Sequence, residues 1–250
     1  MSLTALAETS QGGITAVAAV SSIGLALVHL VSGRWQFSGP NVRRRFLSLA
    51  GGASVAYVFV LLLPEVSEQS SLAAGETAAA ALLAEQRVYV AALSGFVVFY
   101  GLEVFVTQHR DEEVEASELV FWVHIAIFAC YSGLIGYVLF HREGAGLLEL
   151  LYYAVAMALH FTVTDYGLRH HHQEAFYRLG RWILAGTTLL GGLIGFGTEI
   201  EPVPLSMLFG FLAGSIVLNI IKEELPGLDQ SRFGAFVVGA TVYTVLLLLT

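Results

Sequence analysis

Four ionisable residues lie inside or at the edge of long apolar stretches of this 250-residue chain: Glu103, His124, His160 and Asp165. An ionisable side chain is costly in hydrocarbon, so it normally faces a bundle interior, a partner or an ion pathway. Imidazole and carboxylate groups are also ligands for divalent metal ions. These residues therefore predict either buried polar links between helices or a path for a cation.

His160 shares a helix face with Thr164, whereas Asp165 points roughly 140° away from it. Two ligands on one helix need a spacing of three or four residues, so His160 and Asp165 would chelate a metal poorly unless the helix breaks near Thr164. His160 has two interpretations: a transport or metal-binding role, or a hydrogen bond to a neighbouring helix.

His124 has Phe128, which cannot bind a metal, one turn further along its helix, and Cys130 nearby as a soft ligand. A purely structural histidine is the alternative. His29 lies near the end of the first apolar stretch, where we expect it to reach interfacial water. Glu103 lies about one turn from the end of its stretch and can extend to the interface instead of serving a function.

Ser215, Asn219 and Glu223 recur every four residues and share one helix face, flanked by Lys222 and Glu224. This stripe is either the wall of a cation exit path or a helix contact closed by an interfacial ion pair.

A short tract, His170, His171 and His172, could collect metal ions on the cytoplasmic side, although such tracts are also simple polar linkers. No nucleophile motif, phosphate loop, CxxC pair or HExxH helix is present, so we expect no catalytic residues and no enzyme.

The elements that position these residues are eight apolar stretches, each near the roughly 20 residues that span a bilayer. Only 13% of the residues are charged and the mean hydropathy is +0.72. The stretches do not alternate as barrel strands do, so we expect an all-α, multi-pass membrane protein with one domain, residues 1–250. The stretches are residues 13–31, 46–64, 88–107, 120–140, 147–164, 182–197, 205–221 and 233–249.

Basic residues set the expected orientation. The links after the odd-numbered stretches hold ten of the twelve basic residues, and Arg87 and Arg142 lie on the other side. The positive-inside rule makes the odd links cytoplasmic and places both termini outside. A net charge of −8 gives no reason to expect nucleic acid as a partner. Small residues four apart in 182–197, such as Thr187, Gly191 and Gly195, predict a tight helix seam.

Four short motifs, in this order, resemble those of the ZIP (Zrt/Irt-like) family of divalent-metal transporters. They are VLLLPE at 60–65, GFVVFYGLE at 95–103, ALH at 158–160 and AGSIVLNIIKEELP at 213–226. The resemblance implies an eight-helix bundle in a prokaryotic cell (inner) membrane, alternating access, a homodimer, and a divalent cation as substrate, zinc before iron or manganese. It also assigns structural or functional roles to the carboxylates Glu65, Glu103 and Glu224.

The chain departs from the family pattern at the metal ligands. Leu61 stands where the family has histidine, and Phe128 and Thr164 stand where it has carboxylates. Only His124, His160 and Asp165 carry over as metal ligands, with Thr164, Ser215, Asn219 and Glu223 along the pathway. A firm zinc site needs about four ligands, so we expect a degraded or rebuilt site.

The leading hypothesis is therefore a ZIP-like transporter of divalent cations. The alternative keeps the fold without metal transport, as a carrier of another substrate, a sensor or a partner-binding protein. An intramembrane metallohydrolase would need at least three protein ligands and an activated water. A retinal-binding protein would depend on Lys222 alone, at the end of its helix.

Overall fold

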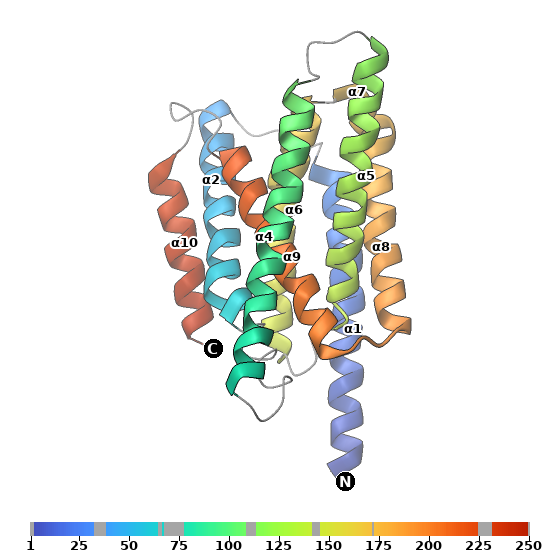
Figure 1. Cartoon of the computed structure of the whole chain (residues 1–250), viewed down its shortest axis with the longest axis vertical. Coiled ribbons are helices and arrows are strands. Elements are labelled where there is room, and N and C mark those ends of the chain that lie inside the picture. Colours follow the sequence, from blue (N-terminus) through green and yellow to red (C-terminus); the bar gives the residue numbers. More distant parts are fainter. Residues whose placement is uncertain are drawn as a thin grey trace.

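The structure, a computed structural model, describes residues 3–32, 39–64, 67, 78–108, 114–141, 146–171, 173–224 and 232–249. Side chains are described for these residues except 3–11, 78–85, 114–117, 170–171, 173 and 223–224. Every regular element in this part is helical, and the long helices lie side by side in a bundle (Figure 1).

Two π-helical turns interrupt the regular α-helices. The turn η2 continues α2, and η3 leads from the short α7 into α8. In chain order the elements are α1 (Leu3–Val31), α2 (Pro40–Tyr57), η2 (Val58–Leu62), α4 (Ala78–Gln108), α5 (Val114–Val138), α6 (Leu147–His171), α7 (Gln173–Ala175), η3 (Phe176–Gly180), α8 (Arg181–Gly197), α9 (Pro202–Glu224) and α10 (Phe233–Leu248).

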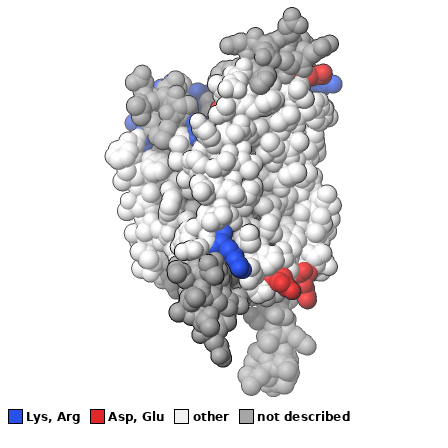
Figure 2. All heavy atoms as spheres, in the orientation of Figure 1, with Lys and Arg blue, Asp and Glu red and all other residues white. Residues whose placement is uncertain are grey.

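Seven helical segments of the described chain are long and apolar enough to cross a membrane, so the protein is an integral multi-pass membrane protein. The eighth, α10, has 16 residues and is shorter. Large apolar side chains such as Val90, Leu193 and Phe196 are exposed, as a lipid environment allows. Figure 2 shows a broad uncharged surface with the charged side chains toward its two ends.

Small residues close the tightest helix contacts. A Cβ atom on Gly136 of α5 would clash with the carbonyl oxygen of Thr188, and one on Gly191 of α8 would clash with that of Gly133. The predicted seam along 182–197 is therefore confirmed, and it joins α8 to α5 within the chain. The pairs α2–α10 and α4–α9 also meet through glycines: Gly52 and Gly239 in the first, Gly95, Gly210 and Gly214 in the second.

The helix pairs repeat with a two-fold pattern. The first half consists of α1, α2 and α4, and the second half consists of α8, α9 and α10, with α5 and α6 between them. The α2–α10 pair corresponds to the α9–α4 pair, and the α1–α6 pair corresponds to the α8–α5 pair. Since α1 and α8 run in opposite directions in Figure 1, the two halves have inverted orientations. Of the two central helices, α6 packs mainly against α1 and α2 of the first half, and α5 packs mainly against α8 of the second half.

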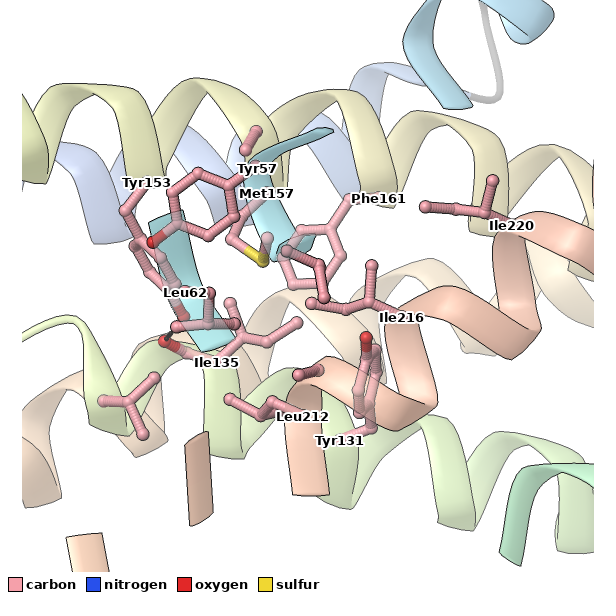
Figure 3. Close-up of a cluster of buried hydrophobic side chains, with 14 of the residues drawn as sticks. Tyr57, Leu62, Tyr131, Ile135, Tyr153, Met157, Phe161, Leu212, Ile216 and Ile220 are labelled. Carbon is pink, nitrogen blue, oxygen red and sulfur yellow. Dashed lines mark hydrogen bonds between the residues drawn. The ribbon is translucent and has the colours of Figure 1, made fainter. Parts of the chain in front are cut away.

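Apolar side chains fill the middle of the bundle (Figure 3). Residues of α2, η2, α5, α6 and α9 meet there with almost no exposure, among them Tyr57, Leu62, Ile135, Met157 and Ile216. The polar groups described next lie beside this core.

Candidate functional site

A buried hydrogen bond between an imidazole and a carboxylate joins α1 to α6. His29 Nδ1 lies 2.8 Å from Asp165 Oδ1, and both side chains are only 1% exposed. The hydroxyl of Ser32, directly after α1, donates to Asp165 Oδ2 over 2.6 Å. Both carboxylate oxygens therefore have a partner, as a buried carboxylate requires.

The carboxylate determines which nitrogen of His29 carries the proton. A carboxylate only accepts hydrogen bonds, so Nδ1 must donate, and in the neutral ring Nε2 keeps a free lone pair. Within the described part of the chain, Nε2 is buried without a hydrogen-bond partner. A carboxylate that orients an imidazole through one nitrogen and leaves the other available is the usual arrangement around metal-binding histidines.

A second polar contact joins α5, α6 and α9. His160 Nε2 lies 2.9 Å from the Tyr131 hydroxyl and 3.4 Å from Thr164 Oγ1. The side chain of Asn219 on α9 also lies beside Tyr131. Counting only described residues, His160 Nδ1 and Asn219 Nδ2 have no hydrogen-bond partner although both atoms are buried.

The two contacts lie on different faces of α6, as the helical spacing of His160 and Asp165 requires. Phe161 separates them: its ring centroid lies 4.2 Å from that of His29 and 6.3 Å from that of His160. Buried polar groups thus run from Ser32 near the end of α1, past Phe161, to Asn219 on α9. The chemistry available along this line is carboxylate, imidazole, hydroxyl and amide, all of which can contact a cation.

The predicted ligand set is not assembled in this state. Among the described residues, no three histidine, cysteine, aspartate or glutamate side chains come together as a metal-binding group. His124 is fully buried but lies two turns, about 10 Å, along α5 from Tyr131, and its ring packs on Phe128. Cys130 is exposed on α5 and belongs to neither contact.

The predicted exit stripe on α9 serves helix packing in this state. The Ser215 hydroxyl donates to the carbonyl of Phe211 over 2.8 Å and packs against Gly95 of α4. Lys222 forms an ion pair of 2.5 Å with Glu103, which links α9 to α4 near their shared end. The side chains of Glu223, Glu224, His170 and His171, and all of His172 and Glu65, lie outside the described residues.

The expectation that His29 reaches interfacial water is wrong, because His29 is buried and paired with Asp165. A signal for this pair was present in the sequence. Both residues lie near the ends of odd-numbered stretches, which run in the same direction, so both come to the same depth of the bundle. Tyr131 and Ser32 carried no comparable signal.

His141, another buried histidine, is different. Its Nδ1 lies 3.1 Å from the carbonyl oxygen of Tyr137 and its Nε2 lies 2.8 Å from that of Thr198. Since both ring nitrogens have backbone partners, His141 is a structural link and has no atom free for a ligand.

Comparisons with known proteins add no identification: no family model matches the chain, and no curated protein matches it.

Proposed function

We propose that the chain is a ZIP-like membrane transporter of divalent cations, zinc first, with Asp165, His29 and His160 as successive contacts of the ion on its path through the bundle. One observation carries the proposal: the carboxylate of Asp165 is buried in a membrane-spanning helix and held by His29 and Ser32. Ionisable groups in such positions are rare and usually serve ion or proton pathways. The free lone pair of His29 supports a role in ligand binding beyond helix packing.

In this proposal, the structure represents a closed state. The oxygens of Asp165 are occupied by His29 and Ser32, and apolar side chains fill the centre of the bundle (Figure 3). A cation must replace these partners at Asp165, and the helices must separate to admit it. The inverted pairing of α1 with α6 and of α8 with α5 supports alternating access, because two similar bundles can move against each other.

The proposed topology has eight crossings with both termini outside. The two ends of the chain lie at the same end of the bundle in Figure 1, as an even number of crossings requires. Eight of the ten basic residues counted on the odd-numbered links are described, and they lie on the helix ends at the opposite end of the bundle, which supports a cytoplasmic assignment for that end.

Uptake into proteoliposomes tests the proposal. Wild-type protein should take up Zn²⁺, Mn²⁺ or Fe²⁺ well above empty liposomes. The double variant His29→Leu/Asp165→Leu removes both polar partners together and should reduce uptake to the level of empty liposomes. His160→Ala should reduce it about tenfold or more, since one buried charge-assisted ligand contact contributes at least 1.4 kcal/mol.

The matched control is His141→Gln, which changes a buried histidine outside the site and should leave uptake unchanged. Wild-type uptake equal to that of empty liposomes, or full uptake by the double variant, would contradict the proposal.

A second candidate function is a protein of the same fold that transports no metal. The packing of His124 on Phe128 and the apolar centre of the bundle favour it. Elemental analysis of purified protein distinguishes the two: near one Zn, Fe or Mn per chain supports transport, and none after dialysis supports the second candidate.

A further inference from the structure

A groove on the outside of the α2–α10 pair combines an apolar wall with two arginines. It has a volume of about 720 Å³ and is lined by residues that include Arg45, Phe46, Leu49, Arg232, Phe233 and Val238. It lies where both helices begin, at the upper left of the bundle in Figure 1. Figure 2 shows basic side chains gathered at this corner.

The two arginines differ in how they are held. Arg232 donates from Nη2 to Asn41 Oδ1 over 2.8 Å, and its backbone N–H donates to Ser48 Oγ over 3.3 Å. Its Nε has no hydrogen-bond partner among the described residues. Arg45 is exposed, and within the described ranges no carboxylate forms an ion pair with either arginine. An anionic group could therefore bind the guanidinium of Arg232, which its hydrogen bonds hold in place, and that of Arg45, which is free to reorient.

The apolar wall continues from the arginines toward the middle of the membrane. Leu49 lies about one helical turn deeper than Arg45 on α2, and Val238 lies more than one turn deeper than Arg232 on α10. Both side chains are exposed, Leu49 by 39% and Val238 by 52%. The groove thus offers positive charge at the membrane boundary and hydrocarbon contact below it.

We propose that this groove binds one anionic phospholipid, with the phosphate between Arg45 and Arg232 and an acyl chain along Leu49 and Val238. Basic pockets between membrane helices at the cytoplasmic boundary suit anionic lipid head groups. A free phosphate ion would use the arginines and leave the apolar wall uncovered, so the two-part lining favours a lipid. The site is independent of the transported ion.

Native mass spectrometry of the purified protein in detergent tests this, with phosphatidylglycerol and phosphatidylcholine of matched acyl chains. We expect one retained phosphatidylglycerol and much weaker binding of phosphatidylcholine. The double variant Arg45→Gln/Arg232→Gln should weaken phosphatidylglycerol binding about 30-fold, because two favourable charges are lost. Arg178→Gln, an exposed arginine at the same end on η3, should bind as the wild type does.

A second variant blocks the groove and keeps both arginines. A Cβ at Gly234 meets nothing within 4 Å, so Gly234→Leu fills the groove without a backbone clash. It should lose lipid binding, whereas Gly186→Leu, at an equally open position on α8, should not. Equal binding of the two lipids, wild-type binding by the double variant, or equal thermal stabilisation by inorganic phosphate and phosphatidylglycerol would overturn the proposal.

Discussion

His29 and Asp165 illustrate how a single buried contact can serve both packing and chemistry. Each partner is out of water, so the loss of His29 leaves Asp165 Oδ1 without a partner, and the loss of Asp165 leaves His29 Nδ1 without one. We predict that His29→Leu or Asp165→Leu alone lowers the free energy of unfolding by about 3–5 kcal/mol. The double variant, which removes both polar groups, should recover to within about 1 kcal/mol of the wild type, because apolar pairs often replace buried ion pairs without loss.

Unfolding in a series of mixed detergent micelles measures these changes. Single-variant losses that add up in the double variant would show that the two side chains do not act as a pair. The recovery of stability also matters for uptake: a double variant that folds well and does not transport separates the functional role of the pair from its structural one.

Part of this residue-level arrangement could be predicted from the sequence. Helical periodicity separates His160 from Asp165, and their partners do lie on different helices, Tyr131 on α5 and His29 on α1. The partners themselves could not be predicted, because a contact between helices depends on the rotation of each helix about its axis. Apolar stretches without a strong polar face leave this rotation undefined.

At the scale of elements, the glycines of α8 divide into packed and open positions. Gly191 lies against the backbone of Gly133, whereas a Cβ on Gly186 would meet nothing within 4 Å. We predict that Gly191→Ala lowers the free energy of unfolding by about 1–3 kcal/mol or more, because α5 and α8 must move apart. Gly186→Ala should be neutral or stabilise it by up to about 1 kcal/mol, because alanine favours the helix.

Thermal unfolding of the two variants side by side measures this difference, since both make the same chemical change in the same helix. Equal effects would mean that α8 does not pack on α5 through its glycine face.

The elements themselves were largely predictable from composition, because a bilayer requires long apolar helices. The small-residue spacing of residues 182–197 also predicted a seam, although not its partner helix. The π-helical turns η2 and η3 had no signal in the sequence. They alter the rotation of α2 and α8 along their length, which again affects which side chains meet.

At the scale of the whole molecule, charge and helix count lead to one testable orientation. Ten basic residues on one side predict that this side is cytoplasmic, and a crossing by α10 places both termini on the other side. The length of α10, 16 residues, is the weakest part of the eight-helix prediction, because a perpendicular helix of that length spans only about 24 Å. Its close pairing with α2 through Gly52 and Gly239 supports a full crossing.

Single cysteines in a Cys130→Ser background test this orientation with a membrane-impermeant maleimide on intact cells. Glu199→Cys, after α8, and Leu249→Cys, after α10, should be labelled from outside, whereas Arg178→Cys on η3 should be labelled only after permeabilisation. All three positions are exposed. If Leu249→Cys behaves like Arg178→Cys, α10 does not cross and the chain has seven spans. If Arg178→Cys is labelled on intact cells and the other two only after permeabilisation, the protein has the opposite orientation. Because ten of the twelve basic residues lie on one side, that result would mean that the positive-inside rule does not determine the orientation of this protein.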